Sequence, residues 1–190
     1  ILLVMLSAAY TIGLEWKRDT QLVLYRISGN SPLTALMGKL LPQTLVFWLI
    51  YILYAVYFYR YLQYPCNSGI MAMIGVGMLT VLGAQGFATF LFGVSGQMRL
   101  SMCLCSLWGI LSFSLAGFTY PVTAMDPILQ KLSVLFPLRH YYLLYVNQAL
   151  NGYSIAYAWH SVLALAIFAL LPLLTLHHYR SLFTKVKYIP

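Results

Sequence analysis

The sequence predicts an all-α, polytopic membrane helix bundle in which a re-entrant pair of short external helices precedes the last span. Three observations lead to this fold class. Hydrophobic residues make up 62% of the chain and charged residues only 7%, whereas about 25% of a soluble domain is charged. Apolar runs of roughly 20 residues, the length that crosses a bilayer, follow one another along the chain. Prolines interrupt a further apolar segment between the last two runs.

Five spans are expected, at residues 1–14, 40–59, 69–94, 102–120 and 155–176 of one transmembrane domain. As a helix the first would rise only about 21 Å, less than the roughly 30 Å of bilayer hydrocarbon. It is therefore expected to be a truncated span. The chain itself is expected to be a fragment, with an upstream first span missing.

Small residues recur in the third expected span, among them Gly83 and Gly86. They let neighbouring membrane helices approach closely, so this span is expected at the centre of the bundle. Gln85 in the same span is the deepest amide of the chain. A polar group at membrane depth either hydrogen-bonds to a neighbouring helix or contacts a transport pathway. Gln85, Gly83 and Gly86 are therefore candidate pathway or helix-packing residues.

The most charged segment, residues 15–39, separates the first two spans. It contains Glu15, Lys17, Arg18, Asp19, Arg26 and Lys39. A short amphipathic helix is expected in it, ending at the turn signal of residues 28–32. The segment is interpreted either as a solvated loop beside anionic lipid head groups or as a docking element for a soluble partner. In the second case Glu15 and Arg18, three residues apart, present charges of both signs.

The distribution of basic residues favours a cytoplasmic location for this segment. With five spans, that orientation places eight of the eleven basic residues inside, in line with the positive-inside rule. The three outside are Arg60, Lys131 and Arg139. Because the basic residues punctuate the apolar runs and form no stripe with exposed aromatics, no nucleic-acid partner is expected.

The re-entrant segment, residues 121–152, is apolar but broken by prolines. Pro127 suits a first helical position, and Asp126 before it suits a helix cap. Broken backbone at membrane depth is tolerated only where protein or a water-filled cavity covers it, so the segment is expected to line a pathway. As a hypothesis, its short helices form an external gate with Arg139 and His140 near lipid head groups. The alternative is that both side chains merely extend to the interface.

Two motifs resemble a known family. The first comprises Glu15-Trp16-Lys17-Arg18-Asp19-Thr20, Leu24, Ser31-Pro32 and Gly38-Lys39, and it is similar to the cytoplasmic coupling region of permeases of the ABC-2 type transporter family. The second, GFTYPVxxMDPxLQxLSxxFPLRHY from Gly117, resembles that family's pattern between its last two spans. It departs from the pattern at Asp126, since a methionine followed directly by proline is common there.

The resemblance implies specific roles. ATPase coupling would fall to Glu15, Trp16, Lys17, Arg18 and Arg26. The re-entrant gate would comprise Pro121, Met125, Asp126, Pro127, Pro137 and Arg139. The chain would hold the last five of six spans of a permease half, and some members carry an extracytoplasmic domain between the first two spans, which such a chain would omit.

The implied assembly is an exporter in the bacterial cytoplasmic (inner) membrane. Two permease halves, identical or different, would pair with two soluble ATPase subunits, surrounded by membrane lipid. The chain would bind no cofactor, with ATP and magnesium held by the ATPase. In agreement, the sequence contains no GxxxxGK[ST] phosphate-binding motif.

Two other classes of membrane protein are alternatives to a permease. A secondary transporter or channel not driven by ATP would be expected to carry ionisable residues within its spans or paired broken helices, and only one broken region is expected here. An intramembrane enzyme would need convergent acids, histidines or nucleophiles, but the chain has three acids, all outside the spans. No catalytic or metal site is predicted, and a transport subunit is expected in place of an enzyme.

Overall fold

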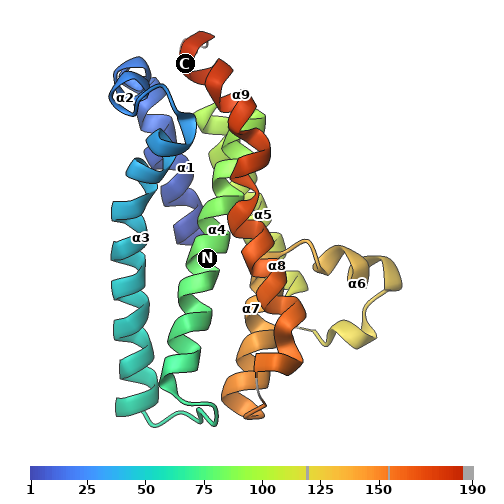
Figure 1. Ribbon diagram of the computed structural model, residues 1–190. Helices are drawn as coiled ribbons and strands as arrows, with labels where there is room; N and C mark the ends of the chain where they lie inside the picture. The colour runs from blue at the N-terminus through green and yellow to red at the C-terminus, as the bar shows by residue number, and fades with distance from the viewer. Residues whose placement is uncertain (119, 154, 186–190) are drawn as a thin grey trace.

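The computed structural model describes residues 1–118, 120–153 and 155–185 of the chain. These residues form an elongated helix bundle without strands (Figure 1), which confirms the predicted all-α fold class. The α-helices are α1 (Leu2–Lys17), α2 (Gln21–Ile27), α3 (Pro32–Val56), α4 (Ile70–Ser95), α5 (Met98–Leu115), α6 (Pro127–Ser133), α7 (Pro137–Tyr145), α8 (Trp159–Leu170) and α9 (Pro172–Lys185). Short 3-10 turns are η2 (Val122–Ala124) and η4 (Ile155–Ala158), and π-helical turns are η1 (Tyr57–Tyr61) and η3 (Val146–Leu150).

Four helical stretches in the described residues are long and apolar enough to cross a membrane. They are Pro32–Tyr61, Ile70–Ser95, Met98–Leu115 and Ala156–Phe183. The last combines η4 with α8 and α9, which meet at Leu171. Pro172 has no backbone N–H, so it cannot continue the hydrogen bonding of α8 without interruption.

Helix boundaries differ from the expected spans where local backbone chemistry decides them. Helix α3 begins at Pro32, not near residue 40, because Ser31 is extended and proline suits the first helical turn. Helix α5 runs from Met98 to Leu115 and ends before the expected residue 120. Gly117, just beyond it, has a φ of 102°, a conformation that ends a helix and favours glycine.

Helix α4 is the centre of the bundle, as its small residues predict. It packs against α1, α3, α5, α7, α8 and α9. In the most apolar 18-residue stretch of α4, 56% of the residues are buried. The corresponding stretches of the other three candidate spans have only 11% to 22% of their residues buried. The other helices therefore use α4 as a common packing surface and present their outer faces to the surroundings.

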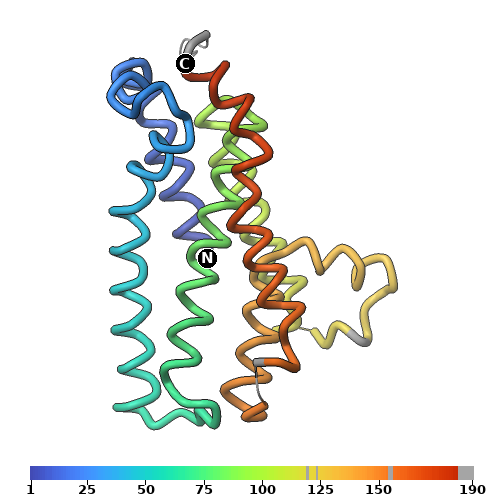
Figure 2. Tube along the Cα trace, in the orientation of Figure 1, coloured from blue at the N-terminus to red at the C-terminus, as the bar shows by residue number. Residues whose placement is uncertain are grey.

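The re-entrant segment forms α6 and α7. In Figures 1 and 2, α6 stands out from the side of the bundle, whereas α7 and η3 run along α8 toward the end of the bundle opposite α2. Phe136 anchors the connection, because its ring is 2% exposed and lies 5.0 Å from the Trp108 ring of α5. The chain thus reverses beside the bundle before the last span begins.

Candidate functional site

The charged segment forms an elbow at one end of the bundle, comprising the end of α1, the helix α2 and the start of α3 (Figure 1). Two tight turns shape it, because Asp19 and Asn30 have positive φ angles of 53° and 59°. The short helix predicted from sequence is α2, and it ends before the predicted turn at residues 28–32. Glu15, Trp16, Lys17 and Arg18 precede the first turn, and Arg26 lies in the last turn of α2.

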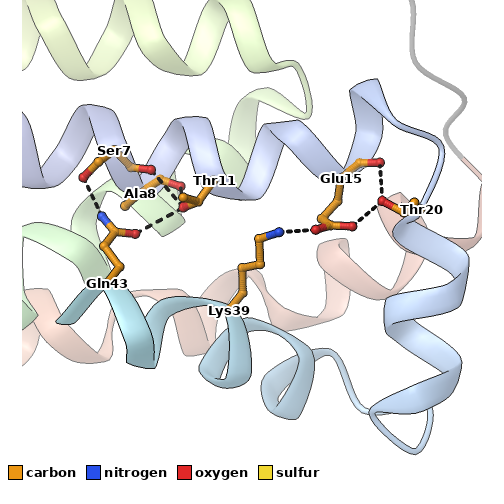
Figure 3. Close-up of polar contacts among 7 residues, drawn as sticks. All are labelled: Ser7, Ala8, Thr11, Glu15, Thr20, Lys39 and Gln43. Atoms are coloured by element: carbon orange, nitrogen blue, oxygen red, sulfur yellow. Dashed lines mark hydrogen bonds and ion pairs between the residues drawn. The ribbon is translucent and has the colours of Figure 1, made fainter. Parts of the chain in front are cut away.

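An ion pair links the two long helices of the elbow. Lys39 Nζ of α3 donates to Glu15 Oε1 of α1, and the Thr20 hydroxyl donates to Glu15 Oε2 (Figure 3). Partial burial alone raises the pKa of Glu15, but the hydrogen bonds from Lys39 and Thr20 and the positive charges of Lys39 and Arg18 outweigh it. The net result is a Glu15 pKa below its ordinary value. At neutral pH the Glu15 carboxylate is therefore charged and is held by its hydrogen bonds to Lys39 and Thr20.

Trp16 packs inside the elbow and does not face outward. Its side chain is 3% exposed, and its ring lies 5.2 Å from Phe92 of α4 and 5.0 Å from Phe183 of α9. Tyr25 of α2 stacks on the same Phe183 ring at 5.5 Å. This aromatic cluster fixes the elbow to the central helix and to the last helix. Lys17, Arg18 and Arg26, by contrast, are exposed.

A second polar link joins α1 to α3 deeper in the bundle. Gln43 Nε2 lies 2.5 Å from Ser7 Oγ, and the Thr11 hydroxyl donates to Gln43 Oε1 at 3.1 Å (Figure 3). Sequence reasoning missed this link and the roles of Lys39 and Thr20. The signal available was weak, because a lone amide in an apolar run does not identify its partner 32 or 36 residues away.

The re-entrant residues lie mainly at helix starts. Asp126 caps α6, since its Oδ1 accepts from the Ile128 backbone N–H at 2.9 Å, and Pro127 is the first helical residue, as predicted. Pro137 begins α7 and is buried. Pro121 precedes the turn η2. The Met125 carbonyl accepts from the side-chain Nε2 of Gln130 at 2.9 Å, which ties the residue before the cap to α6.

Arg139 and His140 have different surroundings. The His140 side chain is 6% exposed and its Nε2 lies 2.8 Å from the Val134 carbonyl. It is therefore enclosed, contrary to the hypothesis that it lies near lipid head groups. Arg139 is half-buried, and its Nη1 is buried with no hydrogen-bond partner among the described residues.

Gln85, Gly83 and Gly86 lie where α4 meets its neighbours. The Thr44 hydroxyl of α3 donates to Gln85 Oε1 at 2.7 Å, in a site where Gln85 is 3% exposed. A Cβ at Gly83 would lie 3.1 Å from the Leu165 carbonyl oxygen, and one at Gly86 only 2.4 Å from the Phe168 carbonyl oxygen. The glycines thus allow α8 to approach α4, and Gln85 joins α3 to α4.

Part of the re-entrant segment borders a cavity of about 620 Å³ between α3 and α7. Its walls are apolar and aromatic. Tyr141 and Tyr145 of α7 line it together with Tyr51 and Tyr54 of α3, and the first residues of α1 line it as well. The described residues contain no cluster of three or more histidines, cysteines and acids that could hold a metal ion.

Comparison with known proteins identifies the family. No curated protein and no solved structure matches the sequence. The family model described as "ABC-2 family transporter protein" matches residues 1–176. The match covers the elbow, the central helix and the re-entrant segment together, in the order that the two sequence motifs indicate. The chain is therefore a multi-pass membrane protein and a permease that belongs to the ABC-2 transporter family.

Proposed function

We propose that this permease is the membrane-spanning subunit of an ATP-driven exporter and that its elbow receives the motion of a separate ATPase subunit. The observation that carries the proposal is the construction of the elbow. Its outer surface offers the cations Lys17, Arg18 and Arg26, while Trp16 and the pair of Glu15 with Lys39 attach it to the bundle. A push on the outer surface would be transmitted to α1 and α3 together, because both are tied at the same point.

The remaining parts of the assembly follow from family membership. A soluble ATPase would bind ATP and magnesium, and a second permease half, identical or different, would complete the pathway. The location would be a bacterial cytoplasmic membrane, with export as the direction of transport. The re-entrant helices α6 and α7 would form the external gate. For α7 the support is the position of Tyr141 and Tyr145 on the cavity wall.

The test is a charge reversal on the elbow in the complete complex. Arg18→Glu together with Arg26→Glu is expected to lower ATP-dependent transport at least tenfold, because exposed cations would no longer face the ATPase surface. Arg99→Glu is the matched control, since Arg99 is an exposed cation of α5 outside the elbow. Unchanged transport in the elbow variant would contradict coupling through these residues.

A second experiment separates this proposal from a secondary transporter or channel. Transport is measured with the partner ATPase inactivated by substitution while an ion gradient is maintained. The proposal expects transport to stop. Continued transport driven by the gradient would establish the alternative.

A further inference from the structure

A groove beside the central helix opens toward the lipid. It has a volume of about 270 Å³ and lies between the start of α3 and the junction of α8 with α9, with α4 as its floor. Met37, Leu170 and Leu173 on its rim are 53%, 59% and 49% exposed. These rim residues belong to helices that are long and apolar enough to cross the membrane, so an acyl chain of the bilayer has direct access to the groove.

The groove runs along the helix axes. Its lining residues come from three stretches, 33–40 of α3, 82–89 of α4 and 169–176 across the junction of α8 with α9. Each stretch covers seven helical steps, which correspond to about 10 Å. One leaflet contributes about half of the roughly 30 Å of bilayer hydrocarbon. The groove therefore follows an acyl chain over about two thirds of the depth of one leaflet.

The surface of the groove suits a hydrocarbon occupant. Its walls are formed almost entirely by leucine, methionine, alanine, glycine and proline. The two polar residues of the floor, Gln85 and Thr89, are 3% and 0% exposed. Their hydrogen bonds stay within the bundle, because the Gln85 amide pairs with the Thr44 hydroxyl and the Thr89 hydroxyl donates to the Gln85 backbone carbonyl. An acyl chain in the groove therefore covers apolar surface.

A cation lies one turn beyond the groove, at the end nearest the elbow. Leu173 and Leu176 line the groove on α9, and Arg180 follows Leu176 by four residues in the same helix. Residues four apart lie on one face of a helix. Arg180, which is exposed, therefore continues the strip of α9 that lines the groove.

The length of the last span places Arg180 at the level of lipid head groups. The stretch Ala156–Phe183 has 28 residues, which correspond to about 42 Å of helix, more than the roughly 30 Å of hydrocarbon. Its ends therefore extend into the head-group regions. Arg180 lies three residues before one end, whereas residues 169–176 lie within the hydrocarbon.

The charge at this end of the bundle is positive. Helix α2, with the exposed Arg26, packs against α9. Of the three acids in the chain, one caps α6 and Glu15 is paired with Lys39, so that only Asp19 of the elbow remains. Basic pockets between membrane helices bind anionic lipid head groups. The end of the groove thus complements a negatively charged head group.

We infer that this groove holds an acyl chain of an anionic phospholipid whose phosphate binds Arg180. A zwitterionic phospholipid fits the groove equally well, but it carries no net charge to complement Arg180, so the site selects the anionic lipid. Binding does not depend on ATP coupling. It can therefore be measured on the permease without an ATPase, and its failure would leave the proposed exporter function untouched.

The probes are phosphatidylglycerol and phosphatidylcholine with the same acyl chains, one of which carries a diazirine at its middle. Each is added at the same low fraction to the full chain in phosphatidylcholine nanodiscs. Ultraviolet light releases nitrogen from the diazirine, and the carbene inserts into a nearby C–H bond. At Met37, Leu170 and Leu173 the phosphatidylglycerol probe is expected to label about fivefold more than the phosphatidylcholine probe, the effect of one basic residue on an anionic lipid. At Leu107, an exposed residue of α5 outside the groove, the two probes should label equally.

Two variants with matched controls complete the test. Arg180→Gln is expected to make the two probes equal in the groove, whereas Arg99→Gln, which removes an exposed cation of α5, should leave the preference intact. Met37→Trp, which fills the groove from its rim, is expected to abolish the preference at Leu170 and Leu173. Leu45→Trp, on an exposed part of α3 outside the groove, should not.

A preference in the groove no higher than that at Leu107, or a preference unchanged by either Arg180→Gln or Met37→Trp, would overturn the inference. If Arg180→Gln does not fold, the ratio of the two probes in the unaltered protein and the result for Met37→Trp still decide it.

Discussion

At the scale of single residues, the link between Glu15 and Lys39 combines stability with pH dependence. The pKa of Glu15 is lower in the folded protein than its ordinary value. The pair of Glu15 with Lys39 therefore stabilises the fold fully at any pH above the ordinary glutamate pKa of about 4.3. This stabilisation is lost as the pH falls through the lower pKa that Glu15 has in the folded protein. The elbow should loosen in acid before the apolar core does.

Glu15→Gln is expected to lower the free energy of unfolding by about 1 kcal/mol at pH 7, because the pair is only partly screened from solvent. The difference from the unaltered protein should shrink as the pH falls below about 4. Thermal unfolding in detergent across this range measures both effects. Asp19→Asn, which removes an exposed acid in the same elbow, is the control, and an equal loss there would show that the ion pair is not responsible.

A second prediction at this scale concerns the contact of α4 with α8. Gly86→Ala places a methyl group 2.4 Å from the Phe168 carbonyl oxygen, so the helices must separate, at a cost of about 1–3 kcal/mol. Gly75→Ala in the same helix is a matched control, because a Cβ there meets nothing within 4 Å. Thermal unfolding should show a clear loss for Gly86→Ala only. Equal midpoints of thermal unfolding for the two variants would contradict the close packing of α4 against α8 at Gly86.

At the scale of elements, local signals explain what the sequence predicts well. The turn at residues 28–32, the cap at Asp126 and the proline start of α6 depend on neighbouring residues, and each is present. Long-range packing determines the features that the sequence does not predict. Trp16 resembles a surface residue among charges, yet Phe92 and Phe183, far along the chain, enclose it. Sequence periodicity cannot show such a partner.

The re-entrant gate gives the prediction at this scale. If Arg139 attracts polar groups at the external gate, Arg139→Ala should lower export and substrate-stimulated ATP hydrolysis together by several-fold. Arg139→Lys keeps a positive charge on a flexible side chain and should retain part of both activities. Lys131→Ala in the exposed α6 serves as the control. Unchanged export in Arg139→Ala would show that the charge of Arg139 has no role in gating.

At the scale of the whole molecule, the elbow and the loop after α3 lie at opposite ends of the bundle (Figure 1). The orientation of the protein in the membrane therefore decides on which side of the membrane each functional element lies. The excess of basic residues near the elbow favours its placement in the cytoplasm. Cys66, a partly exposed residue of the opposite loop, is a natural reporter of the other side.

A membrane-impermeant maleimide should therefore label Cys66 in intact cells, after Cys103 and Cys105 have been replaced by serine. In a chain where Cys66 is also serine, Asp19→Cys places the reporter on the exposed elbow and should react only after the membrane is permeabilised. Reaction of both sites in permeabilised cells is the control for accessibility. If Asp19→Cys reacts in intact cells and Cys66 does not, the elbow faces away from the cytoplasm, and no cytoplasmic ATPase can act on it.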